Sequence, residues 1–286
     1  MKKCLLIWTA LLMFAIQCAS AASFDDDGLL RLVNRDEKIT KKYVPADLVK
    51  PNVPTNKKSQ QESIFMRAEA ARALEEMFQA AKDEKGYTLL AVSGYRAFGL
   101  QQVMFNNKVA AVGSKEKAWR TVAPAGASEH QLGLAQDVIC DTYRYLNSGF
   151  ANTDEGKWLY ENCHRFGFIV RYLKEWEKIT GYAAEPWHFR YVGVNHASAV
   201  QWLNIPYETY AHTAMELPEY ILEKGNAYLL YGIMDNALNG DQCLFEEICD
   251  AAGLTEDQQM ATIEEMTAYF LPEGVSLAQA LSGEVM

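Results

Sequence analysis

Along the first two thirds of the chain, apolar residues recur either with the period of an α-helix or with the period of a β-strand. These two periods predict where helices and strands form. In the segment 63–86 the period is helical, which places one side of the segment in a core. The residues of this face are Ile64, Ala68, Ala71, Leu74 and Phe78. The segment predicts an amphipathic helix with Gly86 as its stop signal. The apolar segment 87–96 follows directly and predicts a buried strand that turns at Gly94.

The region that follows mixes both periods without a regular order. We expect helices at 98–113, 153–167 and 194–204, and strands at 133–143, 168–173 and 186–193. Pro186 can stand only at the start of its strand or on a sheet edge, because proline lacks the N–H that a ladder needs. Since the regular strand–helix–strand spacing of parallel sheets is missing, the expected fold class is α+β, with a small antiparallel sheet flanked by helices.

The first 21 residues have the composition of a secretory signal peptide. Two lysines give a positive start, the apolar run 5–16 follows, and Ala19 and Ala21 form an A-x-A cleavage signal. The run is shorter than the roughly 20 residues of a membrane span. We therefore expect residues 1–21 to be a signal peptide and the mature protein to be secreted or extracytoplasmic, with no stable membrane insertion after cleavage. A retained N-terminal anchor is the alternative.

Charge divides the mature chain into two parts. Residues 22–212 carry 24 lysines and arginines against 23 acidic residues, whereas residues 213–286 carry one lysine, Lys224, against 14 acidic residues. This shift predicts a domain in 22–212 and an acidic extension in 213–286, which keeps apolar residues at helical spacing and is expected to be helical. Neither part has a basic stripe, which argues against nucleic acid as a partner. No pattern indicates an oligomeric state.

Four cysteines follow the predicted signal peptide: Cys140, Cys163, Cys243 and Cys249. Cys140 with Cys163 is a possible disulfide, because export permits oxidation, and a pair of small buried thiols is the alternative. A disulfide between Cys243 and Cys249 would need a break in the helix. Six residues of helix separate two Cα atoms by about 9 Å, and a disulfide needs about 7 Å or less. The absence of a C-x-x-C motif argues against a thiolate zinc site.

The candidate chemistry lies in two short stretches, "SEHQLGLAQDVI" at 128–139 and "EPWHFRY" at 185–191. His130 and Asp137 can supply two zinc ligands, and His188 is the best third. A catalytic zinc site takes three such protein ligands and leaves one position open. Glu185 lies three residues before His188, where a carboxylate could serve as the general base. The alternative is that the two histidines are core residues and Asp137 is an ion-pair partner.

Three motifs, in this order, resemble the zinc D,D-carboxypeptidases of the VanY type. They are "SGYRAFGLQ", "SEHQLGLAQD" and "EPWHFRYVG". The group also includes the D-Ala-D-Ala dipeptidases and the hedgehog fold, and its signature is S-x-H-x-x-G-x-A-x-D followed by E-x-W-H. The resemblance covers roughly residues 30 to 212 and leaves out the acidic extension. It implies the hedgehog/D,D-peptidase fold for the domain.

The resemblance also implies a role for each matched residue. His130, Asp137 and His188 would ligate Zn²⁺, Glu185 would act as general base and then acid, and Arg96 would stabilise the developing oxyanion. A guanidinium suits that task, because it offers charge and fixed donors.

Three further matched residues are the substrate-binding candidates. Gln101 and Ser128 would contact the substrate, and Trp187 would form the wall of the site. The family often has Ser-Tyr after its arginine, where this chain has Ala97 and Phe98. The loss of two hydroxyls affects the fine substrate contacts and leaves the metal ligands unchanged.

The function implied is that of an exported zinc metallocarboxypeptidase that removes the C-terminal D-alanine from peptidoglycan stem peptides, a D,D-carboxypeptidase. One alternative is a different cut in the same material, by an L,D-carboxypeptidase acting on tetrapeptide stems or by a D-Ala-D-Ala dipeptidase. Another is a non-catalytic cell-wall-binding module on the same fold. Glu185 argues for an enzyme, because a module kept for binding alone needs no base beside the metal.

Overall fold

The computed structural model describes Phe24, residues 28–56, 64–215, 222–223 and 225–239, and the two positions Thr255 and Asp257. The chain divides into two compact units, one of residues 22–211 and one of residues 1–21 together with 212–286. The predicted signal peptide and most of the acidic extension lie outside the described residues, and both remain predictions. The described residues contain no helix that is long and apolar enough to cross a membrane.

The larger unit is built on a four-stranded antiparallel sheet, as the periods predict. Its strand order is β3 (Leu89–Ser93), β4 (Ala135–Cys140), β6 (Glu185–Tyr191) and β5 (Phe168–Tyr172). Every residue of β4 is buried, including the polar residues Gln136 and Asp137. Pro186 is the second residue of the inner strand β6, at the start where a missing N–H is tolerated. The α+β prediction is therefore confirmed.

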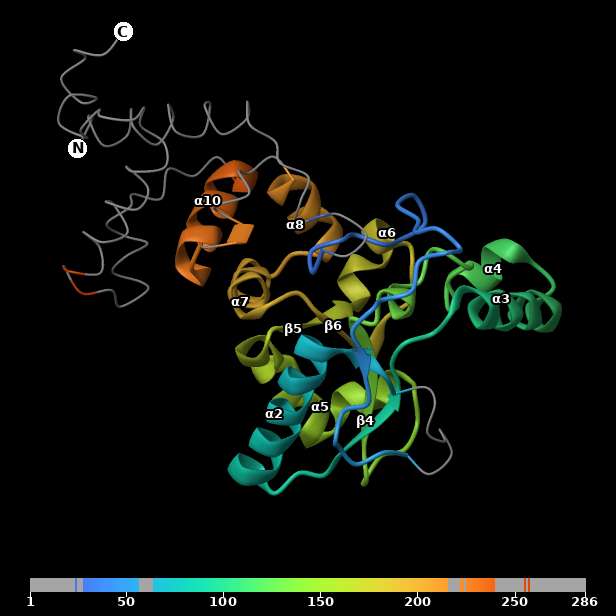
Figure 1. Ribbon diagram of the computed structural model, residues 1–286, viewed down its shortest axis with the longest axis horizontal. Helices are drawn as coiled ribbons and strands as arrows, with labels where there is room; N and C mark the ends of the chain where they lie inside the picture. Colours follow the sequence, from blue (N-terminus) through green and yellow to red (C-terminus); the bar gives the residue numbers. More distant parts are fainter. Residues whose placement is uncertain are drawn as a thin grey trace, which may run out of the picture. The chain divides into compact units, whose positions relative to one another are not determined.

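Helices cover this sheet and complete the core (Figure 1). Helix α2 (Ala68–Lys85) packs on β3 and on α5 (Asp154–Asn162), and α7 (Val194–Leu203) packs on β5. The predicted helix at 63–86 begins later than expected, because Met66–Arg67 forms a short strand, β2, that pairs with β1 (Leu48–Val49). It ends as predicted, since Gly86 adopts φ 75° and its N–H closes the last turn.

Further helices connect these elements. In chain order they are the α-helices α3 (Phe98–Val112), α4 (Lys115–Trp119), α6 (Glu177–Thr180) and α8 (Tyr207–Ala214), and the 3₁₀ helices η2 (Glu129–Leu132), η3 (Ser148–Asn152), η4 (Cys163–Phe166) and η5 (Lys174–Trp176). Helix α10 (Ala227–Asn239) belongs to the second unit.

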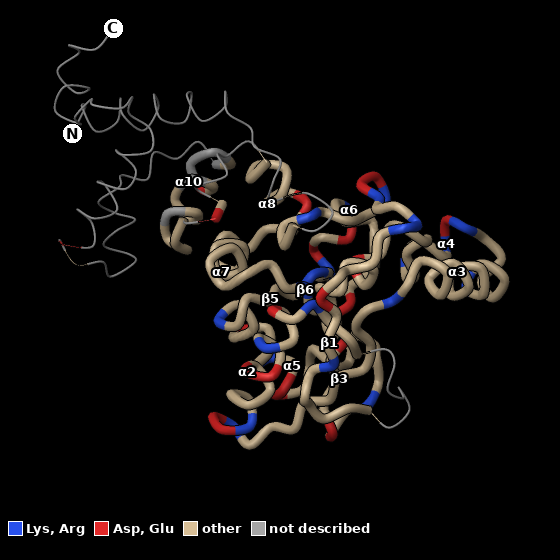
Figure 2. The backbone as a smooth tube through the Cα atoms, viewed as in Figure 1, with Lys and Arg blue, Asp and Glu red and all other residues tan. Residues whose placement is uncertain are grey.

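Helices α3 and α4 lie side by side at one edge of the larger unit, away from α2 and α5 (Figure 1). The tube of α3 is almost free of charged residues (Figure 2). Several of its apolar side chains nevertheless face solvent: Leu100 and Val103 are more than half exposed, and of the residues of α3 only Gln101 and Phe105 are buried.

The two cysteines of the sheet region are free thiols. Cys140 and Cys163 are both buried, and the Sγ atom of Cys140 lies 3.2 Å from Oγ1 of Thr142. Burial raises the pKa of the Cys163 thiol to about 12, which keeps it protonated. The disulfide considered for this pair is therefore wrong, and both residues serve as small buried side chains. Cys243 and Cys249 lie outside the described residues.

Candidate metal centre

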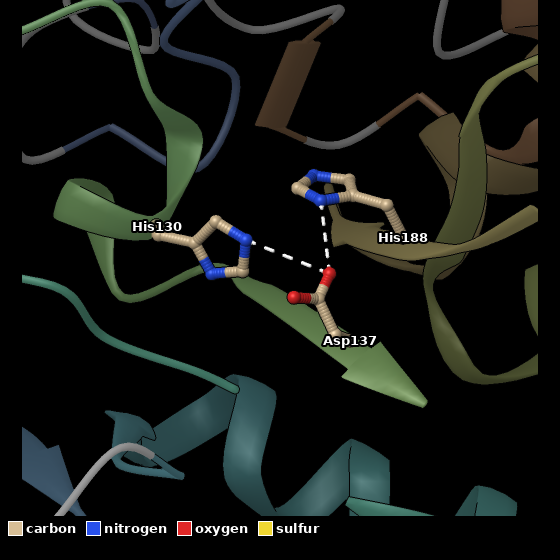
Figure 3. A group of neighbouring side chains, drawn as sticks. All are labelled: His130, Asp137 and His188. Carbon is tan, nitrogen blue, oxygen red and sulfur yellow. Dashed lines mark ion pairs between the residues drawn. The ribbon is translucent and has the colours of Figure 1, made fainter. Parts of the chain in front are cut away.

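His130, Asp137 and His188 meet at one buried point, as the sequence predicts. One ligand atom from each lies within 4.8 Å of the others. They come from three elements, η2, β4 and β6, and both imidazole rings are directed at the carboxylate of Asp137 (Figure 3).

Two local features bring these side chains together. Gly133 ends η2 with φ 68° and turns the chain into β4, and a Cβ atom there would lie only 2.8 Å from Cδ2 of Leu48. In the β4–β6 ladder, Asp137 pairs directly with His188. Opposite residues of an antiparallel pair have their side chains on the same face. The turn therefore positions His130, and the strand register positions the other two ligands.

The hydrogen bonds of each imidazole decide which nitrogen faces the centre. Nδ1 of His130 lies 2.7 Å from the carbonyl oxygen of Gly94, which can only accept, so Nδ1 carries the proton and Nε2 is free. Nε2 of His188 lies 3.2 Å from Oε2 of Glu129, so that nitrogen donates and Nδ1 is free. The free atoms lie 3.6 Å and 3.3 Å, respectively, from Oδ1 of Asp137.

The residues present fit a bound cation. Within the described part of the chain, Oδ1 of Asp137 and Nδ1 of His188 are buried atoms without a hydrogen-bond partner. Leaving such atoms unsatisfied is costly, and native structures do so where a ligand is expected. Two imidazoles and one carboxylate, with no thiolate, are the donor set of a catalytic zinc site.

Electrostatics agree with this interpretation. Burial would raise the pKa of Asp137, but the imidazoles of His130 and His188 outweigh it and hold that pKa below its usual range. Burial would lower the pKa of His188, but Asp137 and Glu129 raise it to about 9. Both shifts show that the surroundings of these residues favour positive charge at this point, which a bound cation would supply.

Glu185 lies beside this centre. Its Oε2 atom is 4.0 Å from Nδ1 of His188, and its side chain is 18% exposed. Burial, and then the charge of Asp137, raise its pKa to about 7 against the opposing effect of His188. A carboxylate with this pKa can take up and release a proton near neutral pH, which is the property that the predicted general base needs.

Arg96 also lies beside this centre. Its Nη1 donates to Oε1 of Gln101 at 2.8 Å, and its Nη2 donates to Oγ of Ser93 at 2.9 Å. The same Nη2 lies 3.9 Å from Oδ2 of Asp137. The backbone N–H of Arg96 also donates to the carbonyl of His130, which ties the predicted arginine to the segment that carries a ligand.

The three substrate-binding candidates lie near the site in different surroundings. Gln101 is 1% exposed, and both ends of its amide are occupied, since Nε2 donates to the carbonyl of Ala123. Its position is suited to orienting Arg96. Ser128 is buried directly before η2, and Trp187 packs partly buried against the hydrophobic core. Their contacts with substrate remain predictions.

Sequence reasoning missed a second set of buried charges, which we call the arginine–glutamate cluster: Glu129, Arg171, Arg190 and Glu208. Oε1 of Glu129 accepts from Nε of Arg171 at 2.8 Å and from Nη1 of Arg190 at 2.9 Å. Arg171 also forms a two-pronged pair with Glu208, at 2.6 and 2.8 Å. Burial would raise the pKa of Glu129, but the two guanidinium groups hold it well below its usual range.

A signal for this cluster was present in the sequence. Arg171 and Arg190 stand within the apolar runs "FIVRYL" and "PWHFRYVG", and both are fully buried in strands. A charged residue at a buried strand position requires a buried partner of opposite charge. The partner could not be chosen from sequence, because Glu129 lies 42 and 61 residues away along the chain.

Comparisons with known proteins agree with this site. Residues 63–194 match the family model described as VanY, D-alanyl-D-alanine carboxypeptidase. The putative carboxypeptidase YodJ of Bacillus subtilis is 44% identical over 185 residues, which are 64% of this chain and 67% of that protein. Among solved structures, the LdcB LD-carboxypeptidase is 43% identical with a TM-score of 0.63, over 66% of this chain and 87% of that one.

A second solved structure bears on the metal. A vancomycin-resistance D,D-pentapeptidase VanY in complex with Zn(II) is 34% identical with a TM-score of 0.52, over 63% of this chain and 96% of that one. An antiparallel sheet that presents two histidines, an aspartate and a neighbouring glutamate defines a zinc metallopeptidase. Within that class, the chain belongs to the VanY D-alanyl-D-alanine carboxypeptidase family, as its motifs predict.

Proposed function

We propose that the protein is an exported zinc carboxypeptidase that removes the C-terminal D-alanine from peptidoglycan stem peptides. The observation that carries this proposal is the convergence of His130, Asp137 and His188 with Glu185 and Arg96 at one buried site. A bound zinc ion would polarise the scissile carbonyl and acidify the attacking water.

Glu185 would handle the protons of the reaction. With a pKa near 7, its carboxylate can accept a proton from the attacking water and pass it to the amine that leaves with D-alanine. Its side chain is largely shielded from solvent, so this proton is not lost to bulk water between the two steps.

Arg96 would bind and stabilise negative charge. Gln101 and Ser93 hold its guanidinium in place before the substrate arrives, so little reorganisation is needed when charge develops on the scissile carbonyl oxygen. The charge also suits the terminal carboxylate of the peptide, which every carboxypeptidase substrate carries.

Hydrolysis of either of two peptide bonds would release D-alanine from a stem peptide. We propose the L,D bond of tetrapeptide stems as the preferred cleavage site. The greater identity and TM-score of the match to the LdcB LD-carboxypeptidase support it. The D,D bond of pentapeptide stems, expected from the motifs, is the second candidate. It is supported by the family description and by the match to the VanY D,D-pentapeptidase.

The decisive experiment incubates the purified protein with zinc and with each stem peptide separately, and identifies the products by mass. Loss of one D-alanine from the tetrapeptide, with slower loss from the pentapeptide, is the expected result. The opposite preference would make the enzyme a D,D-carboxypeptidase. No cleavage of either peptide by a zinc-loaded protein would favour the cell-wall-binding alternative.

Export is supported by the composition of residues 1–21. Sequencing the N-terminus of the mature protein tests it directly. Cleavage near Ala21 or Ala22 is expected, and an intact Met1 would point to the retained anchor.

A further inference from the structure

Glu129 stands between the metal centre and the arginine–glutamate cluster and contacts both. It is 1% exposed and comes immediately before the ligand His130 in η2. The motifs assign Glu129 no role as a metal ligand, catalytic residue or substrate contact, but its contacts indicate one.

The two carboxylate oxygens of Glu129 have separate partners. Oε1 accepts from both guanidinium groups, of Arg171 and of Arg190. Oε2 faces Nε2 of His188 at 3.2 Å. The arginines therefore hold the carboxylate charged and fixed through one oxygen, and leave the other for the imidazole.

The strand geometry supports this division. His188 and Arg190 are two residues apart in β6, so their side chains lie on the same face of the sheet. Arg190 is itself immobilised, because its Nη2 also donates to the backbone carbonyls of Leu29 and Arg31. Arg190 thereby fixes the position of the Glu129 carboxylate relative to the imidazole of His188.

We propose that Glu129 is the positioning residue for His188, that its Oε2 fixes the proton on Nε2 and leaves Nδ1 as the ligand atom, and that it thereby sets the affinity of the site for zinc. A carboxylate behind a ligating imidazole orients the ring and increases its basicity. This inference rests on the zinc site of the proposed function, but not on which peptide bond is cleaved.

The competing interpretation is that Glu129 only neutralises two buried arginines. The chain offers a matched control, because Glu208 is also a buried carboxylate on Arg171 and contacts it at 2.6 and 2.8 Å. None of the metal-centre contacts described above involves Glu208. Glu129→Gln and Glu208→Gln thus remove the same charge from the same cluster, with and without the contact to His188.

The test measures the zinc dissociation constant of the full chain by competition with a chromophoric chelator, without any peptide. Glu129→Gln should weaken zinc binding on the order of 10- to 100-fold, the usual cost of losing such a partner. Glu208→Gln should leave the dissociation constant unchanged, whatever it does to the melting temperature. Equal zinc affinity in wild type and Glu129→Gln, or equal weakening in both variants, would overturn the proposal.

A measurement on the wild-type protein keeps the proposal testable even if Glu129→Gln does not fold. Long-range ¹H–¹⁵N correlation spectra of the zinc-loaded protein report which nitrogen of His188 carries the proton. A proton on Nε2 and metal on Nδ1 are expected. The reverse assignment would overturn the proposal. Because no peptide is present, a failed carboxypeptidase assay would be a separate result.

Discussion

The metal centre and the arginine–glutamate cluster are both buried groups of charged residues in the same unit. They differ in whether all their buried polar atoms have hydrogen-bond partners. In the cluster, no buried side-chain atom of Glu129, Arg171 or Arg190 lacks a partner among the described residues. In the metal centre, one buried side-chain atom of Asp137 and one of His188 have no hydrogen-bond partner. Buried polar atoms are normally paired. A network in which every buried atom is paired holds its members in fixed positions, whereas an incomplete one indicates a place for a ligand.

The largest expected effect is on turnover in the incomplete centre. Glu185→Gln should lower kcat by about 10²- to 10⁴-fold, because it removes the general base. Zinc content should stay near one ion per chain, since Glu185 is not among the proposed ligands. His188→Ala is the contrasting variant and should lose zinc. Steady-state kinetics with metal analysis checks both, and a Glu185→Gln protein with most of its kcat would refute the base role.

In the completed cluster, removing a charge should destabilise the fold. Arg171→Met leaves the carboxylate of Glu208 buried without its partner, which typically costs about 3–5 kcal/mol of stability. Urea unfolding of the metal-free protein measures this loss. A change below about 1 kcal/mol, the range of an exposed ion pair, would show that the cluster contributes little.

In the metal centre, removing a charge should instead increase the stability of the metal-free protein. Burial raises the pKa of Glu185 from 4.5 to about 7, so its contribution to stability is present below pH 4.5 and lost as pH rises through 7. Glu185→Gln cannot ionise. The metal-free variant should thus be more stable than wild type at pH 8, by about 3 kcal/mol, and this advantage should shrink towards pH 5. Chelator-treated samples unfolded at both pH values provide the comparison, and a pH-independent difference would contradict it.

Arg96 should affect catalysis and leave the metal in place. Arg96→Ala should lower kcat on the order of a hundredfold or more, as the loss of one oxyanion donor does. Arg96→Lys should restore only part of the rate, because an ammonium group lacks the planar fork. Zinc content should not change in either variant. An increase in KM alone would mean that Arg96 only holds the substrate.

The smallest effect is expected at Gln101, which acts through Arg96. Gln101→Ala should lower kcat about tenfold, less than the loss of Arg96 itself, because Ser93 still holds one end of the guanidinium. In the double variant with Arg96→Ala, the two losses should not add. Additive losses would instead support the direct substrate contact expected from the motif.

Local patterns were enough to predict much of this structure. The strand at Asp137, the stop at Gly167 and the place of Pro186 near the start of β6 all follow from signals within a few residues. The three metal ligands were found because their spacing matches a known motif. The partners of Arg171 and the pairing of Gln101 with Arg96 depend on long-range packing and on side-chain direction, which a single sequence does not encode by spacing. The late start of α2 had the same origin, since Met66 pairs with another strand.

The direct pairing of Asp137 with His188 also bears on the fidelity of folding. A slip of one residue between β4 and β6 would turn His188 to the opposite face and separate the two ligands. Only a correctly paired sheet can therefore retain the ion, and the ion in turn stabilises that pairing against every alternative. Zinc content therefore reports on the register of these two strands, and newly made chains with mispaired strands should be recognisable as the fraction that binds no zinc.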